Sequence, residues 1–334
     1  AAASTSITEG GASGSVCVVL TGTTGSPTEL ANALAVSVAS VLNGEAGAGD
    51  FSLGASVTIP AGTMLPTDGS HCVAVSGTED TLLEGDEAFG ARISGTDQSA
   101  VVSVGASDTA TVTITENDAG EVEVAAASVG ITEDGAAGSV CVVLTGTTGS
   151  PTELANALAV SVVSVLNAEA GAGEFSLGSS VTIPAGTTLP TDGSHCVTVS
   201  GMEDTLLEGD EAFGARISGT DQTSVVSVGA SDTTTVTITD NEAAEVDVAA
   251  SSVSITEGGA AGSVCVVLTG TTGSPTELVN ALAVSVTSLL NAEAGAGDFS
   301  LGPSVTIPAG TTLPTDGSHC VAVSGTEDTF LEGD

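Results

Sequence analysis

The chain has 334 residues, of which 42 are acidic and only two are basic, so its formal net charge is −40. This charge excludes nucleic acids and anionic membrane surfaces as partners, because both are bound by clusters of Lys and Arg. The hydrophobic fraction of 41% favours a folded protein over the disorder that acidic sequences often show. Since no apolar run approaches the ~20 residues of a membrane span, we expect no membrane insertion. No signal peptide is recognisable, and we expect the sequence to be a mature or partial piece of a longer protein.

The sequence repeats itself every 124 residues. Cys17, Cys141 and Cys265 stand in the same context, and the block LTGTTGSPTEL occurs three times at this spacing. A unit of this length can bury its own core, and the period is too long for a solenoid, so we expect independent domains joined like beads. The predicted domains are repeat one (1–120), repeat two (121–244) and an incomplete repeat three (245–334).

Short apolar segments separated by Gly, Pro and Asp turns predict strands throughout each repeat. In repeat one the predicted strands are Ser4–Thr8, Ser15–Leu20, Leu30–Leu42, Ser56–Ile59, His71–Ser76, Phe89–Ser94, Val101–Val104 and Thr109–Thr115. The segment Leu30–Leu42 also fits one face of a helix, but its alternating Val residues and β neighbours favour a strand. Residues Ala119–Val124 are expected to link the repeats directly.

The predicted fold class is therefore all-β. Seven or so short strands with turns every 8–12 residues indicate antiparallel, Greek-key, immunoglobulin-like β-sandwiches in tandem. Because no flexible Gly/Ser tract separates the repeats, we expect them to be joined end to end in a fairly stiff rod.

Each repeat contains two cysteines in apparent strands. An even count with none left over is typical of an oxidising compartment, and predicts one disulfide within each repeat. A pair of buried free thiols is the alternative, whereas zinc is disfavoured because no Cys-x-x-Cys pair is present. The predicted bridges are Cys17–Cys72, Cys141–Cys196 and Cys265–Cys320. We therefore expect the protein to be extracellular or at the cell surface.

One acidic stretch recurs in every repeat. Glu79–Glu87 contains five carboxylates in nine residues, the stretch returns as Glu203–Glu211, and a third copy begins at Glu327. Like charges this close repel, so the stretch either stays solvated or folds around a cation. A solvated acidic surface that keeps a Val-rich protein soluble is the simpler alternative.

Five motifs resemble those of the Calx-β domain, a module of sodium–calcium exchangers and of large bacterial surface proteins. In repeat one they are Ile7–Gly10, Ala48–Phe51, Val57–Gly62, Glu79–Phe89 and Thr111–Asp118. Together, in this order and repeated, they cover the whole 124-residue unit. The run that closes the last strand departs from the family pattern, because Asn117 and Asn241 interrupt it.

The resemblance implies Ca²⁺ binding where the acidic loops meet at one tip of each sandwich. In repeat one it implicates Glu9, Asp50, Glu79, Asp80, Glu84, Glu87, Glu116 and Asp118. In repeat two it implicates Glu133, Glu174, Glu203, Asp204, Glu208, Glu211, Asp240 and Glu242. In repeat three it implicates Glu257, Asp298, Glu327, Asp328 and Glu332. Carboxylates from several loops supply the six to eight oxygen ligands that Ca²⁺ prefers.

The functional expectation is a structural extracellular rod, stalk or filament whose partners are neighbouring copies of itself. Its Ser/Thr-rich turns offer sites for O-linked sugars. A calcium-dependent adhesin and a calcium-sensing module are the alternatives, and no catalytic motif predicts an enzyme. Because repeat three stops at Asp334, before its last strands, we expect either further repeats in the chain or a strand supplied by a neighbouring molecule.

Overall fold

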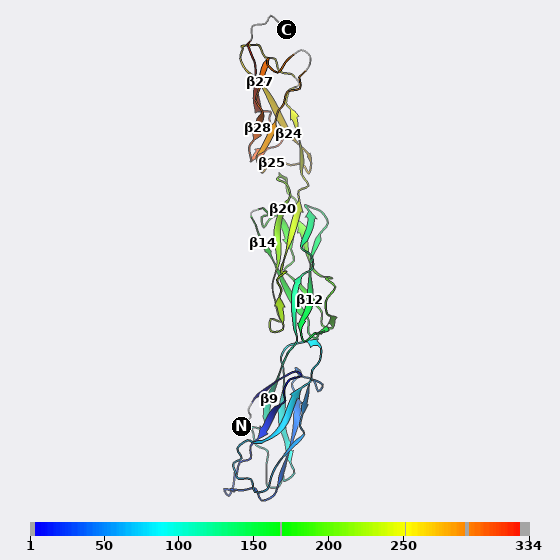
Figure 1. Ribbon diagram of the computed structural model, residues 1–334, viewed down its shortest axis with the longest axis vertical. Helices are drawn as coiled ribbons and strands as arrows, with labels where there is room; N and C mark the ends of the chain where they lie inside the picture. Colours follow the sequence, from blue (N-terminus) through cyan, green and yellow to red (C-terminus); the bar gives the residue numbers. More distant parts are fainter. Residues whose placement is uncertain (1–3, 168, 251, 291–293, 328–334) are drawn as a thin grey trace.

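The computed structural model describes the chain except for residues 1–3, 168, 251, 291–293 and 328–334. In Figure 1 the strands gather into successive lobes along the longest axis of the molecule, following the sequence from blue to red. All the regular elements of these described residues are strands. Accordingly, no helix suited to crossing a membrane occurs among them.

Repeat one consists of two packed sheets. The larger sheet has the order β1 (Thr5–Thr8), β9 (Thr109–Thr115), β8 (Glu87–Thr96), β3 (Leu34–Leu42) and β5 (Ser56–Ile59). The smaller sheet has the order β2 (Gly14–Val18), β6 (His71–Gly77) and β4 (Phe51–Leu53). Neighbouring strands are antiparallel except β1 and β9, which are parallel. This arrangement confirms the predicted all-β, immunoglobulin-like sandwich.

The core of repeat one forms where the inward faces of the two sheets meet. Because successive side chains point to opposite faces of a strand, alternate residues such as Val36 and Val38 in β3 are buried. Phe89 in β8 is also buried, and Phe51 in β4 stacks on it with ring centroids 3.6 Å apart. Burying a side chain of this size contributes ~1.5–3 kcal/mol, so this aromatic pair is a main link between the sheets.

Repeat two has the same plan with a larger second sheet. Its first sheet has the order β11 (Ser128–Thr132), β22 (Thr233–Thr239), β20 (Glu211–Thr220), β14 (Leu158–Val165) and β16 (Ser180–Ile183). Its second has the order β15 (Phe175–Leu177), β18 (His195–Gly201), β12 (Gly138–Thr148), β10 (Ala119–Val124) and β21 (Val226–Val228). The segment expected to be a plain linker is therefore a strand of the repeat that follows it.

The described part of repeat three contains two sheets of its own. One has the order β23 (Ala243–Val248), β24 (Gly262–Thr272), β30 (His319–Gly325) and β27 (Phe299–Leu301). The other pairs β26 (Leu282–Ser285) with β28 (Ser304–Ile307).

Two small sheets join one repeat to the next. At the first junction the order is β17 (Thr187–Thr188), β13 (Glu153–Leu154) and β7 (Leu82–Leu83). At the second it is β19 (Leu206–Leu207), β25 (Glu277–Leu278) and β29 (Thr311–Thr312). In both cases the middle of an acidic stretch pairs, in parallel, with the following repeat. The acidic stretch is thus a contact between repeats as well as a loop.

Each described repeat holds one disulfide between neighbouring strands. The bridges join Cys17 to Cys72, Cys141 to Cys196 and Cys265 to Cys320, which is the predicted pairing. In each case the two cysteines stand directly opposite one another in adjacent antiparallel strands.

Two strand predictions need correction. The segment Leu30–Leu42 is a strand as expected, but it begins at Leu34. The strand predicted at Val101–Val104 is wrong for repeat one, although its counterpart forms β21 in repeat two. The physical reason is the partner: β21 pairs with β10, and the described part of repeat one has no strand in that place. A strand forms where a neighbour satisfies its backbone N–H and C=O groups.

Candidate metal centre

The acidic side chains of repeat one are delivered by loops at the end of the sandwich that faces repeat two. Glu9 follows β1, Asp80 and Glu84 flank β7, and Glu87 begins β8. The segment Glu116–Asp118 follows β9 and precedes β10. Because these strand ends lie at one edge of the fold, residues distant in sequence come together there.

Three carboxylates in repeat one converge closely. Glu9, Asp80 and Glu84 each offer an oxygen atom, and these atoms lie within 4.8 Å of one another. Repeat two contains two such groups that share one residue. They are Glu133 with Asp204 and Glu208, and Glu133 with Asp240 and Glu242. Both complete repeats therefore hold a carboxylate group of the kind that binds a divalent cation.

Several of these carboxylates are buried and have oxygen atoms without a hydrogen-bond partner. Glu9 is 5% exposed, and its Oε1 atom has no hydrogen-bond partner. Both carboxylate oxygens of Asp118 are likewise buried without a partner. In repeat two the same holds for one oxygen of Glu133 and both of Glu242. A buried, unpaired carboxylate is costly unless a cation or a proton neutralises it.

Burial and mutual repulsion raise the pKa values of these groups. Burial, followed by the neighbouring Glu116, raises the pKa of Glu9 to about 8. Burial, with the charges of Asp80 and Glu116, raises the pKa of Glu84 to about 7. Burial, with Glu84 and then Asp50 close by, raises the pKa of Glu87 to about 8. At neutral pH a positive charge would therefore stabilise the ionised form of these carboxylates.

Repeat two repeats this electrostatic pattern. Burial raises the pKa of Glu208 to about 7, with the charge of Asp204 as the next cause. Burial also raises the pKa values of Glu211 and Glu242 to about 8. For Asp240 burial acts in the same direction, but backbone N–H donors outweigh it and its pKa is lowered.

One carboxylate, that of Glu116, both organises the loops and contacts Glu9. The Glu116 carboxylate accepts hydrogen bonds from the backbone N–H groups of Asn117 (2.8 Å) and Asp118 (2.7 Å). It also accepts bonds from the N–H groups of Glu84 and Gly85. In repeat two Asp240 takes the same place. This residue therefore ties the acidic stretch to the end of β9 or β22.

Two positioning residues, Asn117 and Asp86, lie outside the set of ligands predicted from the sequence. Asn117 donates from Nδ2 to the backbone oxygen of Glu9 (2.9 Å) and to Oε2 of Glu79 (2.8 Å). Asp86 accepts a hydrogen bond from the backbone N–H of Glu116 (3.0 Å). The signal was present in the sequence, because Asn117 and Asn241 stand at the same place in their repeats. Asn117 is thus part of the site's framework, although it interrupts the acidic run.

The remaining predicted ligands lie around the central groups. Asp50 contacts Glu87, and Glu174 contacts Glu211 at the matching place. Glu79 and Glu203 are held by Asn117 and Asn241. In repeat three Glu257, Asp298 and Glu327 are described, without a converging group of three among them, whereas Asp328 and Glu332 lie outside the described residues.

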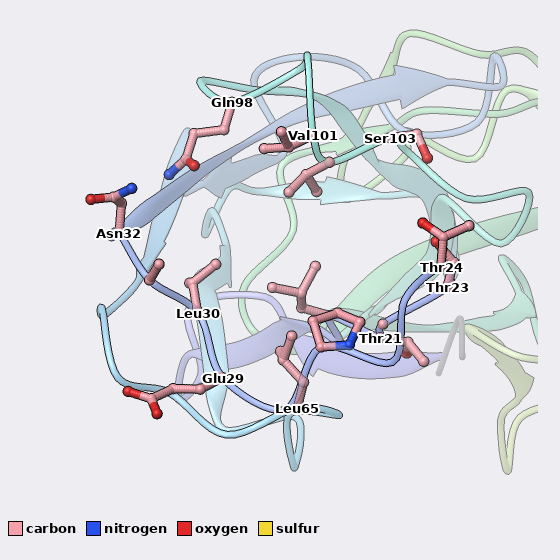
Figure 2. Close-up of a pocket in the computed structure, with 15 residues that line it drawn as sticks. Thr21, Thr23, Thr24, Glu29, Leu30, Asn32, Leu65, Gln98, Val101 and Ser103 are labelled. Atoms are coloured by element: carbon pink, nitrogen blue, oxygen red, sulfur yellow. The ribbon is translucent and has the colours of Figure 1, made fainter.

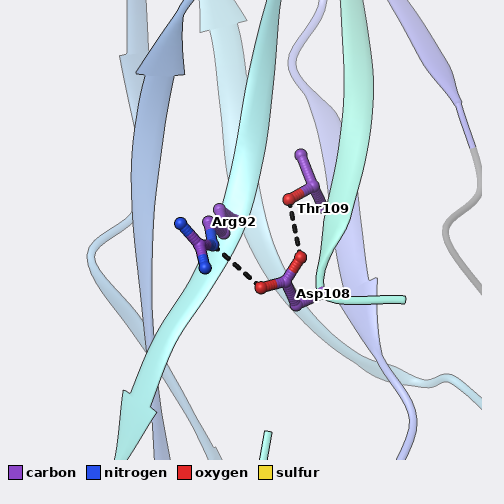
Figure 3. Close-up of polar contacts among 3 residues, drawn as sticks. All are labelled: Arg92, Asp108 and Thr109. Carbon is purple, nitrogen blue, oxygen red and sulfur yellow. Dashed lines mark hydrogen bonds and ion pairs between the residues drawn. The ribbon is translucent and has the colours of Figure 1, made fainter. Parts of the chain in front are cut away.

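The basic residue of repeat one is used elsewhere. Arg92 donates from Nε to Oδ2 of Asp108 at 2.8 Å, and Thr109 donates to the other Asp108 oxygen (Figure 3). The Arg92 hydrogen bond is the main cause that lowers the pKa of Asp108. This is the one ion pair found within the described residues, and it involves none of the predicted ligands. The carboxylate group therefore has no arginine to neutralise it.

The donor set fits a hard divalent cation. Ca²⁺ prefers carboxylate and carbonyl oxygens from several loops, and it tolerates irregular geometry. The buried, unpartnered oxygens of Glu9 and Asp118 would be stabilised by a cation beside them. Glu9, Asp80 and Glu84 are the residues of repeat one that would hold such an ion.

The acidic loops also touch the next repeat. Thr81 accepts a backbone hydrogen bond from Thr152 (2.8 Å), and the two hydroxyl groups lie 2.9 Å apart. The Leu83 carbonyl accepts a bond from the N–H of Ala155 (3.1 Å). A side chain at Gly149 would collide with the Asp118 carboxylate, and Gly149 has a positive φ of 68° that favours glycine. Metal ligands and junction contacts thus alternate along one short stretch.

The chain is similar to one known domain family and to several solved structures. The family model of the Calx-beta domain matches residues 2–118 and 189–242, together about half of the chain. Among solved structures, the calcium binding domain CBD12 of CALX1.1 is 14% identical and has a TM-score of 0.30; the match covers 70% of this chain and 96% of that one. The adhesin FdeC of Escherichia coli is 13% identical and has a TM-score of 0.27, with 90% and 86% covered. Titin domains I67–I69 are 10% identical and have a TM-score of 0.28, with 97% and 95% covered. No curated protein sequence matches significantly.

Proposed function

Since this chain belongs to the Calx-β domain family, we propose that its repeats bind Ca²⁺ at their acidic ends and so stiffen an extracellular array. Calx-β domains are calcium-binding β-sandwich modules with binding or structural roles and are not enzymes. We propose that this chain is not an enzyme either. The bound ion would supply the positive charge that the clustered carboxylates need.

The proposal rests mainly on the surroundings of the Glu9 carboxylate. Its carboxylate is buried, has an unpartnered oxygen, and lies beside Asp80 and Glu84 without a basic side chain. A merely solvated acidic surface would leave such groups exposed to water. The same arrangement recurs at Glu133 in repeat two, which supports one site type per complete repeat.

Stiffening follows from the place of the ligands. Asp80 and Glu84 lie on either side of Leu82–Leu83, the two residues that pair with repeat two, so an ion that fixes both carboxylates also fixes strand β7. The free energy of ion binding then opposes bending at the junction. Repeat two has the same relation to repeat three through Asp204, Glu208 and β19.

An extracellular location is the further part of the proposal. Three disulfides suit an oxidising compartment, and Ca²⁺ is abundant outside cells. We propose neighbouring repeats of the same kind as the partners of the array. O-linked sugars on the Ser/Thr-rich turns remain a prediction, which mass spectrometry of the native protein can test.

Titration calorimetry of the chain with Ca²⁺ tests the proposal. We expect binding in repeats one and two, and the double variant Asp80→Asn/Glu84→Gln should lose the binding that belongs to repeat one. Glu29→Gln is the matched control, because this exposed residue lies outside the carboxylate group. Absence of binding at millimolar Ca²⁺, or equal binding by the double variant and the parent, would refute the proposal.

A further inference from the structure

One cavity of repeat one lies away from the carboxylate group. It has a volume of about 420 Å³, and its apolar lining includes Leu20, Pro27, Leu30, Leu65, Val101 and Val102. Figure 2 shows Val101 on one side of the open space, with Leu30 and Leu65 on the other. A smaller cavity of about 60 Å³ continues it between Val18–Leu20 and Val102–Gly105. Together they form a groove, here called the repeat-one groove.

The equivalent place in repeat two is filled. The matching residues, 124 positions later, include Leu144, Leu154 and Val225, and they are buried in one core cluster. Leu83 from repeat one and Val122 from β10 belong to this cluster. Val101 in the repeat-one groove is 80% exposed, whereas its counterpart Val225 is 6% exposed. In repeat two the apolar lining is thus covered by Leu83 and Val122.

The occupant is held through the backbone. In repeat two, the N–H of Gly120 donates to the Val225 carbonyl (2.8 Å), and the N–H of Gly229 donates to the Val122 carbonyl (3.0 Å). On its other edge β10 pairs with β12, with Val122 opposite Leu144. β10 therefore lies between β12 and β21 and completes a five-stranded sheet.

The described part of repeat one shows the edges of such a sheet without a strand between them. β2 has 5 residues, whereas β12 and β24, which pair with β10 and β23, have 11 each. The segment Val102–Val104 does not form the strand that its counterpart β21 forms. Both differences concern the backbone that β10 pairs with in repeat two.

We propose that the repeat-one groove accepts the terminal strand of another repeat of this kind. The strand adds between Leu20 and Val102 by β-strand addition, in which backbone hydrogen bonds give affinity and alternate side chains give specificity. Its pattern is that of β10, Gly-Glu-Val-Glu-Val, with the first Val directed into the core as Val122 is. The Leu-Leu segment of the same repeat then covers Leu30, as Leu83 covers Leu154.

Polar contacts add a second level of recognition. In repeat two the Glu123 carboxylate accepts a hydrogen bond from the N–H of Ser231 (3.0 Å). Ser107 is the counterpart of Ser231 in repeat one. Among the described residues, no predicted calcium ligand lines the groove, so strand binding goes beyond the proposed calcium function and needs no metal.

The first arm of the test adds the peptide Ala119–Ala126 to the 334-residue chain in chelator. We expect the peptide to bind at the repeat-one groove and not at repeat two, because β10 already lies between β12 and β21 there. Amide exchange at Leu20–Thr24 and Val101–Gly105 should slow by about tenfold or more as new hydrogen bonds close. The control peptide carries Val122→Asp, which puts a charge into the apolar groove, and should not bind.

The second arm fuses the sequence of Ala119–Val124 directly before Ala1, in the order found at the start of repeat two. This chain should show the slowed exchange without peptide, and it should no longer bind peptide. Protection in the fused chain supports the proposal even if the free peptide is too weak to bind. Unchanged exchange at Val101–Gly105 in the fused chain, or peptide protection at other segments only, would overturn it.

Discussion

Leu83 of repeat one and Leu154 of repeat two stand opposite each other across the junction, and both side chains are fully buried. Leu83 precedes Glu84, one of the three converging carboxylates. The core of repeat two is therefore completed by a residue of the preceding acidic stretch. The same short segment therefore contributes to ion binding, to the contact between the repeats and to the core of the next repeat.

Shortening Leu83 should destabilise repeat two. Leu83→Ala removes a buried side chain from the core cluster of that repeat, and such changes cost ~2–5 kcal/mol. Leu207→Ala is the matched change at the second junction, where the side chain is only partly buried. Thermal unfolding should show the larger loss for Leu83→Ala. Equal and small losses would contradict the role of Leu83 in the junction.

The metal-free chain should lose stability as the pH rises. Because the pKa of Glu9 is raised from 4.5 to about 8 in the folded chain, the folded state binds the proton more tightly than the unfolded state. This stabilisation is complete below about pH 4 and disappears as the pH passes about 8. Melting temperatures measured in chelator from acid to alkaline pH should therefore fall.

Net charge alone also weakens an acidic fold at high pH, so matched variants are required. Glu9→Gln should flatten the pH dependence more than Glu29→Gln, which removes the same charge from an exposed position. Identical pH profiles for these two variants would assign the effect to overall charge instead.

Asn117 should matter for ion binding although it is not acidic. Asn117→Ala removes the amide that holds Glu79 and the backbone of Glu9, so the loops lose their arrangement before any ion binds. We expect weaker Ca²⁺ binding by repeat one, with repeat two unchanged. Asn241→Ala should give the mirror result, and calorimetry can compare the two. Unchanged affinity in both variants would show that the amide has no positioning role.

The disulfide of repeat one should contribute strongly to its stability. Cys17–Cys72 closes a loop with a sequence separation of 55, and the chain-entropy model gives about 4 kcal/mol for such a loop. The double variant Cys17→Ser/Cys72→Ser should therefore lower the unfolding midpoint of repeat one and leave that of repeat two in place. A midpoint equal to the parent's would contradict this estimate.

The fold was predictable from local pattern, because each repeat carries the same alternation and turn residues. The segment Val36–Val38 alternates as a half-buried strand should, and the cysteines lie in strands that pair directly. The ambiguous stretch from Leu30 was resolved as a strand by its β neighbours. These are short-range signals that one repeat contains by itself.

The contacts between repeats were not predictable in the same way. Leu82–Leu83 looks like part of a solvated acidic loop, and Ala119–Val124 looks like a linker, because each finds its partner in the next repeat. Val101–Val104 has strand-like residues but no partner in the described part of repeat one. At the site, the acidic residues that converge were predicted from the sequence. Asn117 was not, because its role depends on the contacts that its amide makes in the folded structure.

Calcium should stiffen the junctions between repeats, and small-angle scattering of the whole chain measures this effect. Scattering would be compared in chelator and at millimolar Ca²⁺, for the parent and for the double variant Asp80→Asn/Glu84→Gln. Ca²⁺ should give the parent a longer, less variable shape, and the variant should respond less because its first junction stays flexible. Identical dimensions of the parent with and without Ca²⁺, under conditions where calorimetry detects binding, would contradict it.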